Sequence, residues 1–196
     1  MMDKPWPFAL LAVPWLAAGL AGGPASAFDG AILSHFHLAG HDALVPATRF
    51  VTHLGGWMVL SVLALAGAVW LAARGRRADA AWLAGIVLGG RALVEAQKAL
   101  IGRARPGLEH LVEVGSASFP SGHSANTLIT GLALALMLSG RRWAVIAALV
   151  MAVAVGWSRM ALGVHWPTDV VGGWAFAALW VLALLGLKAR MGARPA

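Results

Sequence analysis

Six apolar stretches run through this 196-residue chain, and they restrict its fold more than any other feature of the sequence. Hydrophobic residues make up 60% of the chain and charged residues 12%, a balance typical of membrane spans and not of a soluble domain. A spanning helix needs about 20 apolar residues, with a range of about 17–25. We therefore predict an all-α integral membrane protein with one domain, 1–196, built as a six-helix bundle. The stretches cover residues 6–21, 56–73, 80–100, 124–138, 143–157 and 170–187, of which the fourth and fifth need their flanks to reach span length.

The basic residues indicate the orientation of this bundle, because cytoplasmic connections carry an excess of Lys and Arg. In a six-span arrangement nine of the 15 basic residues fall at one end, which we assign to the cytoplasm. They are Lys4, Arg74, Arg76, Arg77, Arg141, Arg142, Lys188, Arg190 and Arg194. All seven histidines fall at the opposite end, which then faces the periplasm or the cell exterior. The net charge of +7 follows from this topology, so the expected partner is a lipid bilayer and not nucleic acid.

The N-terminal stretch admits two interpretations. Lys4, an apolar run and Ala25-Ser26-Ala27 together are typical of a signal peptide with an A-x-A cleavage site, and cleavage would leave five helices. The stretch before Gly22 is nearly long enough to span a membrane, which favours a retained first helix. Both interpretations keep the remaining chemistry on the same face of the membrane.

Residues 28–55 mix apolar and polar positions, and we expect one or two amphipathic helices there at the outer membrane surface. His35, His37 and His41 lie in this segment, next to Asp42. A closed metal site needs convergent ligands with oriented partners, and this spacing is too loose for one. We therefore expect a solvated run of histidines and no metal ion.

The outer half of the third apolar stretch carries charges at membrane depth. Such charges are costly and usually face a bundle interior or a water-filled cavity. Arg91 and Glu95 are four residues apart, so we expect them to neutralise one another as a structural ion pair on one helix face. Lys98 lies near the helix end, where its side chain can snorkel to the surface.

Residues 119–123, Phe-Pro-Ser-Gly-His, precede an apolar helix that we expect from about residue 125 to residue 138. Ser121 can cap this helix, and Gly122 lets a ligand approach the backbone closely. Unpaired N–H groups and the positive end of the helix dipole make the helix start an anion site, with phosphate a natural guest. His123 stands beside that anion, where a proton can be delivered. Taken alone, the segment is equally compatible with a capped helix that carries an incidental histidine.

Further residues on the outer side carry complementary chemistry. Arg105 has a planar fork suited to two phosphate oxygens, while Lys98 supplies a compact charge. His165 and Asp169 are four residues apart, so the carboxylate can hold the imidazole in the tautomer that a nucleophile or general base requires. A lone His–Asp pair is more often structural, but this pair shares its face of the membrane with Arg159 and the other cations.

These residues together resemble the type 2 phosphatidic acid phosphatase superfamily, whose pattern is K-x6-RP, then PSGH, then SR-x5-H-x3-D. Every named position of the pattern is matched with the family spacing, between residues 98 and 169. The matching residues are Lys98, Arg105-Pro106, Pro120-Ser121-Gly122-His123, Ser158-Arg159, His165 and Asp169. The resemblance implies a six-helix membrane phosphatase with its active site at the outer membrane surface.

The resemblance also implies a role for each matched residue. His165 is expected to attack phosphorus and become a phosphohistidine, held by Asp169, while His123 protonates the leaving oxygen and then activates water. The phosphoryl oxygens are expected to be bound by Lys98, Arg105, Arg159, Ser121 and the Gly122 backbone N–H. Because three cations can neutralise the charge of a phosphoryl transition state, no metal or other cofactor is expected.

Two other classes share parts of this pattern. Vanadium-dependent haloperoxidases carry the same three motifs but are soluble, which the apolar stretches argue against. A non-catalytic membrane protein with intramembrane charges does not need complete catalytic motifs. The expected substrate is a membrane lipid phosphate: undecaprenyl diphosphate is favoured, and phosphatidic acid, phosphatidylglycerophosphate and lipid A phosphate are the alternatives within the family.

Overall fold

The computed structural model describes residues 6–192, and the regular elements in this range are helices. Two of the basic residues assigned above to the cytoplasmic end, Lys4 and Arg194, lie outside it. The elements are α1 (Trp6–Ala21), α2 (Ala27–Phe36), the 3₁₀ segment η1 (Asp42–Leu44), α3 (Val45–Leu54), α4 (Trp57–Ala73), α5 (Arg77–Ile101), α6 (Gly122–Leu134), the π-helical segment η2 (Ala135–Ser139), α7 (Arg142–Ala161) and α8 (Pro167–Gly192).

Each of the six apolar stretches is helical, as α1, α4, α5, α6 with η2, α7 and α8. The last four, α5 to α8, extend past both predicted ends, because capping and charged residues continue the helix beyond the apolar run, whereas α1 and α4 match the predicted bounds to within one residue. Among residues 6–192, three segments are long and apolar enough to cross a membrane: Asp42–Ala73, Arg142–Ala161 and Pro167–Gly192. α5, which carries charges in its outer half, and α6, which has 13 residues, are not among these three.

Local sequence explains where the helices next to the motif residues begin and end. Ser121 is the N-cap of α6, as predicted, and its Oγ accepts from the Ser124 N–H at 3.5 Å and from the Ser124 hydroxyl at 2.9 Å. The helix therefore starts at Gly122, three residues before the predicted start. α5 ends at Ile101 and is followed by Gly102, which has φ 61°, a conformation that glycine adopts at little cost. Pro167 opens α8, where its missing N–H is no loss.

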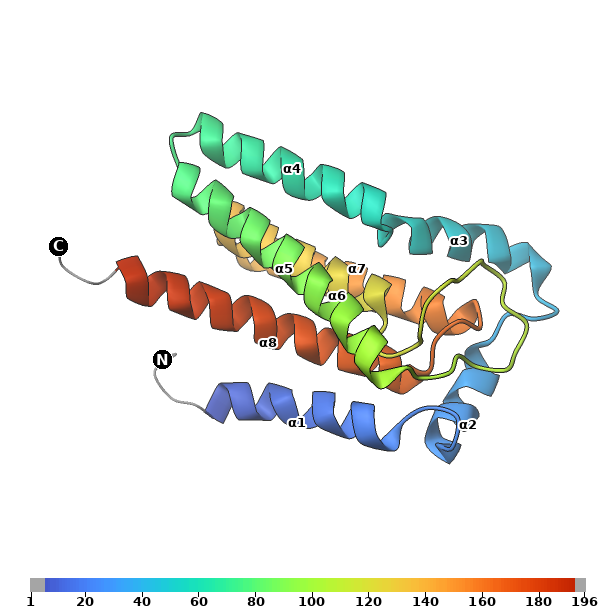
Figure 1. Cartoon of the computed structure of the whole chain (residues 1–196). Coiled ribbons are helices and arrows are strands. Elements are labelled where there is room, and N and C mark those ends of the chain that lie inside the picture. The colour runs from blue at the N-terminus through green and yellow to red at the C-terminus, as the bar shows by residue number, and fades with distance from the viewer. Residues whose placement is uncertain (1–5, 193–196) are drawn as a thin grey trace.

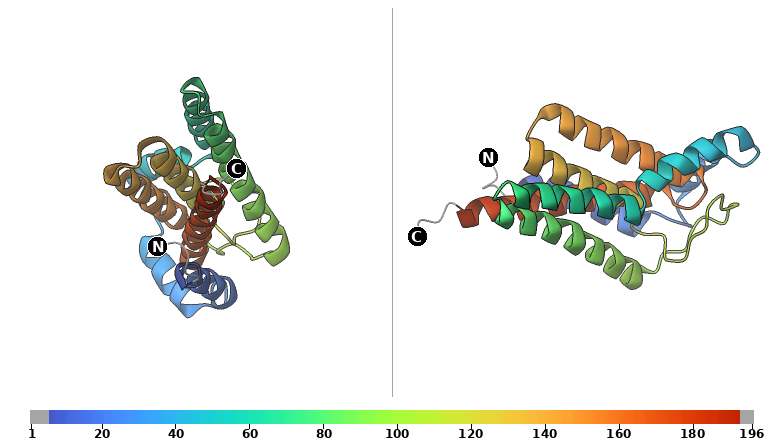
Figure 2. Two further views of the ribbon diagram at one scale, coloured as in Figure 1. Left: turned by 90° about the vertical axis from the view of Figure 1, so that its left-hand side faces the viewer. Right: turned by 90° about the horizontal axis from the view of Figure 1, so that it is seen from above.

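α6 is the central helix of the bundle and packs against α4, α5, α7 and α8, while α1 lies along α8 (Figures 1 and 2). The core around α6 is built from aliphatic side chains of five helices, among them Leu83, Ile86, Ile129 and Val181. α4 and α5 lie close together at their connecting turn and diverge toward the opposite end of the bundle (Figure 1). That opposite end carries α2, α3, the long loop 102–121 and the short α7–α8 loop.

The segment 28–55 forms helices α2 and α3, in agreement with the prediction of one or two helices. Its histidines do not converge: His37 Nε2 lies 2.9 Å from the Glu109 carbonyl oxygen and so helps to hold the loop 102–121. Within the described residues, no group of three or more His, Asp or Glu side chains is placed to share a metal ion. Arg49 of α3 holds the same loop by donating to the Leu111 carbonyl from Nε and Nη2, at 2.8 and 2.6 Å.

The predicted ion pair between Arg91 and Glu95 is wrong. Glu95 lies instead 3.7 Å from Lys98, its neighbour three residues further along α5. The Arg91 guanidinium stacks over the Trp57 ring of α4, 5.5 Å from the ring centroid. The prediction from the i,i+4 spacing did not take account of Lys98 on the same helix or of the Trp57 ring on the neighbouring helix. Lys98 does not extend to the surface, as its place near the helix end would have allowed, because it is buried, with 8% of its surface exposed.

Candidate active site

The loop 102–121, the start of α6 and the α7–α8 loop meet at one end of the bundle and bring the predicted site residues together. Backbone hydrogen bonds join these pieces, with the Leu111 N–H donating to the Leu162 carbonyl at 3.0 Å and the Ser121 N–H to the Asp169 carbonyl at 3.0 Å. Gly173 makes the second contact possible, since a Cβ at this position of α8 would lie 2.9 Å from the Ser121 oxygen.

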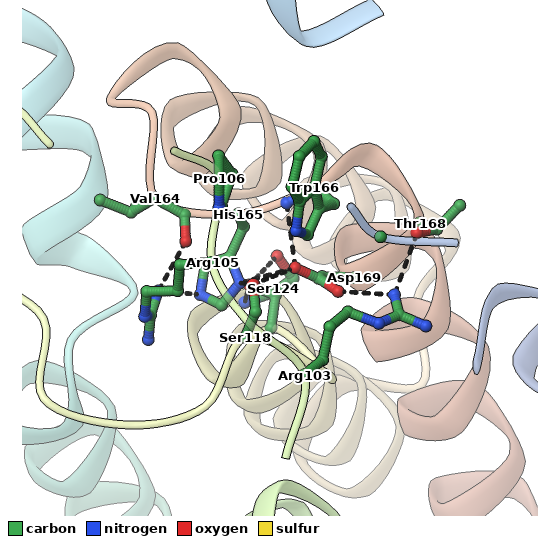
Figure 3. A network of polar contacts seen from close by, with 12 residues as sticks. Arg103, Arg105, Pro106, Ser118, Ser124, Val164, His165, Trp166, Thr168 and Asp169 are labelled. Atoms are coloured by element: carbon green, nitrogen blue, oxygen red, sulfur yellow. Dashed lines mark hydrogen bonds and ion pairs between the residues drawn. The ribbon is translucent and has the colours of Figure 1, made fainter. Parts of the chain in front are cut away.

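His165 and Asp169 form a buried pair in this end of the bundle (Figure 3). His165 Nδ1 lies 3.3 Å from Asp169 Oδ2, while Nε2 lies 3.3 Å from Arg105 Nη1. The carboxylate fixes the proton on Nδ1, so Nε2 carries the lone pair. Burial lowers the pKa of His165 from 6.5 to about 3, although Asp169 opposes the change. The ring is therefore neutral at physiological pH, as a nucleophile has to be.

Asp169 is itself held by several donors. Its Oδ2 accepts the Ser118 hydroxyl and, at 2.9 Å, the Trp166 backbone N–H; its Oδ1 accepts Arg103 Nη1 at 2.8 Å. The carboxylate is fully buried and lies in the first turn of α8, where the helix dipole favours negative charge. Because both oxygens are bound, the carboxylate has one orientation. Its contact with Nδ1 then orients the His165 ring.

Arg103 connects this pair to the N-terminal part of the chain, a function that the sequence analysis missed. Its Nη2 donates to the carbonyl oxygens of Ala18 and Gly19, at 2.7 and 2.8 Å, in the last turn of α1. Its Nη1 also lies 3.1 Å from the Thr168 hydroxyl (Figure 3), and that hydroxyl donates to Asp29 of α2 at 2.6 Å. A chain of polar contacts therefore runs from α1 and α2 through Asp169 to His165.

Three cations, Lys98, Arg105 and Arg159, lie within electrostatic reach of one another, and Arg105 and Arg159 also act on the His165 ring. Arg105 donates to the carbonyl oxygens of Ser116 and Val164, at 2.8 and 2.6 Å, which turns its fork toward His165. Lys98 Nζ lies 2.9 Å from the Ser116 hydroxyl. Arg159 is 4% exposed and donates from Nη1 to the Thr52 hydroxyl at 2.9 Å, while its buried Nε has no hydrogen-bond partner in the described chain.

The start of α6 faces the same cations. The missing side chain of Gly122 leaves room for Lys98, whose Nζ lies 3.4 Å from the position that a Cβ would take. His123 follows at the first turn, half-buried, within electrostatic reach of Arg159, His165, Lys98 and His53. The start of α6 thus brings free backbone N–H groups and His123 together with the cations.

The structure gathers at this end all eight residues for which we predicted catalytic or phosphate-binding roles: His123, His165, Asp169, Lys98, Arg105, Ser121, Gly122 and Arg159. A neutral imidazole with a free lone pair, a nearby second imidazole and three cations can bind a tetrahedral anion and transfer its phosphoryl group. Arg103, Ser118 and Asp29 had no assigned role. Their contacts join residues that are between 51 and 139 positions apart, and no local spacing indicates such contacts.

The comparisons with known proteins agree on one family. Residues 55–191 match the model of the PAP2 superfamily. The crystal structure of a transmembrane PAP2-type phosphatidylglycerolphosphate phosphatase from Bacillus subtilis superposes with a TM-score of 0.80 at 30% identity, over 97% of this chain and 98% of that one. A decaprenylphosphoryl-5-phosphoribose phosphatase from Mycolicibacterium smegmatis is 35% identical over 144 residues, which are 69% of this chain and 74% of that protein.

Other similarities are shorter. An undecaprenyl-diphosphatase from Sulfolobus acidocaldarius is 42% identical over 57 residues, 29% of this chain and 27% of that protein. The matched stretches of three curated relatives cover between 27% and 54% of their lengths. This chain therefore matches only part of the length of each of these three relatives.

Proposed function

Because the chain belongs to the PAP2 superfamily and is a membrane protein, we propose that it hydrolyses a phosphate ester or anhydride of a membrane lipid through a phosphohistidine intermediate. The observation that carries this proposal is the His165 ring, with Nδ1 3.3 Å from Asp169 Oδ2 and Nε2 3.3 Å from Arg105 Nη1. The fold alone would not support an activity, whereas a neutral, oriented imidazole among three cations supports this one.

In the first step the lone pair of His165 Nε2 attacks phosphorus. A P–N bond forms, the P–O bond to the lipid breaks, and its electron pair goes to the leaving oxygen, which His123 protonates. Asp169 stabilises the positive charge that develops on the His165 ring. Lys98, Arg105 and Arg159 would bind the phosphoryl oxygens, on which the negative charge of the transition state is spread.

In the second step water breaks the P–N bond. His123, now without its proton, takes a proton from the attacking water, and the electron pair of the P–N bond returns to His165 Nε2. Inorganic phosphate leaves and the neutral imidazole is restored. Since Lys98, Arg105 and Arg159 supply the positive charge, we expect activity to persist in EDTA and to be inhibited by vanadate, which adopts the five-coordinate geometry of the transition state.

We further propose that all six apolar helices span the bilayer and that the site opens at the outer face. The described basic residues of the predicted cytoplasmic set lie at the α4–α5 turn, the η2–α7 turn and the end of α8, opposite the site. The chain contains no cysteine, so a single cysteine introduced near Gly107 or near Gly75 reports on topology without background labelling. A membrane-impermeant thiol reagent should label the first and not the second in intact cells; the reverse result would invert the orientation.

For the substrate we propose undecaprenyl diphosphate, which would be cleaved to the monophosphate. A site at the membrane surface suits a phosphate whose apolar tail stays in the bilayer, and the similarity to the Sulfolobus undecaprenyl-diphosphatase supports this choice. Phosphatidic acid, phosphatidylglycerophosphate and lipid A phosphate are the alternatives.

The test of this substrate is competitive. Undecaprenyl diphosphate, phosphatidic acid and phosphatidylglycerophosphate are mixed at equal mole fractions in detergent micelles, and phosphate release is followed for each. We expect the diphosphate to have the highest kcat/KM. If a glycerophospholipid exceeds it by about tenfold, the choice of substrate fails while the lipid-phosphatase class stands. If no lipid phosphate is cleaved, the proposed function itself fails.

A further inference from the structure

Arg91 is a charged residue that the mechanism above does not use. It lies ten residues before the end of α5, half-buried among apolar helices, and its described contact is the stack on Trp57. Within residues 6–192 it has no carboxylate partner, because Glu95 pairs with Lys98. A cation held at membrane depth without a counter-ion is costly and usually marks a ligand or ion pathway.

Two polar residues of α6 lie beside Arg91 among apolar ones, and they continue the active-site face of that helix. Asn126 and Thr130 line the same pocket as Arg91, between α4, α5 and α6. They follow His123 at intervals of three and four residues, so the three side chains share one face of the helix. The Thr130 side chain is 1% exposed, and its hydroxyl has no hydrogen-bond partner in the described chain. A buried hydroxyl without a protein partner leaves a hydrogen bond for a water molecule or a ligand group to make.

We propose that Arg91, with Asn126 and the Thr130 hydroxyl, binds the phosphate that stays on the lipid when a lipid diphosphate is cleaved, and so selects diphosphates over monoesters. The inference rests on the proposed phosphatase function and adds a second anion-binding position to it. The phosphate to be removed lies among Lys98, Arg105 and Arg159, and the retained phosphate lies one position deeper in the bundle.

The separation of the two positions fits this assignment. Arg91 and Lys98 are seven residues apart on one face of α5, which places them about 10 Å apart along the helix. Two linked phosphates can fill that distance with one charge-assisted hydrogen bond of about 2.8 Å at each end. The pocket has a volume of about 30 Å³, so the long Arg91 side chain has to turn from the Trp57 ring to receive a phosphate oxygen.

Beyond Arg91 the pocket continues as an apolar cavity. Ser61, Val87 and Leu88 border both spaces, and the deeper cavity, of about 180 Å³, is lined by aliphatic side chains of α4 and α5. Moving away from the catalytic histidines, the polar pocket at Arg91 comes first and the apolar cavity second. A lipid diphosphate has the same order, with the retained phosphate first and the hydrocarbon second. The divergence of α4 and α5 in Figure 1 opens toward the same end as the active site.

The position would also assist the chemistry. When His165 attacks the terminal phosphorus, the electron pair of the broken P–O bond moves to the oxygen that remains on the retained phosphate. Negative charge therefore grows on the group beside Arg91, and a cation there stabilises the transition state more than the ground state. A lipid monophosphate places an uncharged alkyl ester at that position and gains nothing from it.

The test compares two substrates with one tail, farnesyl diphosphate and farnesyl monophosphate, in detergent micelles. Arg91→Gln should lower kcat/KM about 10–100-fold on the diphosphate, the scale of a lost hydrogen bond to a charged group, and leave the monophosphate value nearly unchanged. Arg91→Lys keeps the charge and should recover most of the loss. Arg74→Gln is the matched control, since Arg74 stacks on Trp70 at the other end of α4, 4.8 Å from the ring centroid.

Thr130→Val separates binding from folding. It replaces a buried hydroxyl that has no partner by a methyl group of similar shape, so the melting temperature should stay the same or rise. The diphosphate kcat/KM should nevertheless fall, while the monophosphate value stays. Equal losses on both substrates in the Arg91 and Thr130 variants, or no loss on either, would overturn the inference and leave the phosphatase intact. A wild-type protein that cleaves the monophosphate and not the diphosphate would overturn both this inference and the choice of substrate.

Discussion

His165 and His123 lie at the same end of the bundle, but their surroundings differ. The His165 ring is 1% exposed and bound on both nitrogens, and its partner Asp169 is held by Ser118, Trp166 and Arg103. The His123 ring is half-buried and makes no hydrogen bond with any other residue in the described range. The fold thus fixes the proposed nucleophile before substrate binds, whereas the partner of the proposed acid has to come from the substrate.

Replacing the nucleophile should have the largest effect. His165→Ala removes the atom that would form the P–N bond, and without cysteine the chain has no thiolate to replace it. We expect phosphate release to fall about 10⁵–10⁶-fold, the scale seen when a catalytic nucleophile is removed. Retained activity of a few per cent would contradict the assignment. His35→Ala, at an exposed position of α2, is the matched control and should leave the rate unchanged.

Asp169→Asn tests whether the fixed orientation of His165 matters. An amide can no longer hold the proton on Nδ1 or stabilise the charged ring, and the expected loss in kcat is about 10⁴-fold. The Arg103 guanidinium would also lose its carboxylate partner, so the melting temperature should be measured beside the rate. A folded variant with nearly normal turnover would show that the pair is structural.

His123→Ala should be sensitive to the leaving group, as His165→Ala should not. A general acid contributes about 10²–10⁴-fold when the leaving oxygen is basic, and little when it is not. We therefore expect a loss of that size on a lipid monophosphate and a much smaller loss on p-nitrophenyl phosphate, whose phenolate leaves without a proton. Equal losses on the two substrates would contradict the role of acid and would point to phosphate binding.

Arg103→Lys should have an intermediate effect on the rate, because Arg103 acts only by positioning Asp169 and His165. A single ammonium group cannot bind Asp169 and the α1 carbonyls at once, as the forked guanidinium does. A shift of the carboxylate and of His165 by a fraction of an ångström should lower kcat by up to about 10²-fold, with little change in KM. Arg49→Lys is the control, because Arg49 holds the same loop without touching Asp169. A matching loss in the control would assign the effect to the loop.

The smallest effect concerns pH and stability. Because burial lowers the pKa of His165 to about 3 from 6.5, the unfolded chain takes up a proton below pH 6.5 that the folded protein takes up only near pH 3. The contribution of this residue to stability is therefore complete above pH 6.5 and is lost as the pH falls toward 3. Melting temperatures in detergent should fall less steeply over this range in His165→Asn than in the wild type. Parallel curves would show that the ring is not buried in its neutral form.

Much of the proposed site was predictable from the sequence because the chemistry uses short, fixed spacings. The cap at Ser121, the four-residue spacing of His165 and Asp169, and the cations on one side all follow from local rules, and the structure brings them together. Arg91 was misassigned for the same reason, since a local rule paired it with Glu95 and could not take account of Trp57, which lies on another helix. Residues whose partners are distant in the chain escaped prediction.

Asp29 illustrates that limit. In the sequence it is one acidic residue in a mixed segment, and nothing near it suggests a partner. In the fold it is fully buried and accepts from the Gly23 N–H at 2.6 Å and from the Thr168 N–H and hydroxyl at 2.9 and 2.6 Å. Only the packing of α2 against the start of α8 creates this site, so its role depends on tertiary structure that single-sequence patterns do not contain.

The contact of Arg103 with the Ala18 and Gly19 carbonyls has a consequence for biosynthesis. The ribosome makes α1 before α8, so the acceptors that hold Arg103 exist long before Asp169 has been translated. His165 can take its final orientation only after α8, which carries Asp169, has been made and has docked beside α1. Every shorter nascent chain then lacks an oriented His165, and phosphatase activity begins only when translation has passed α8.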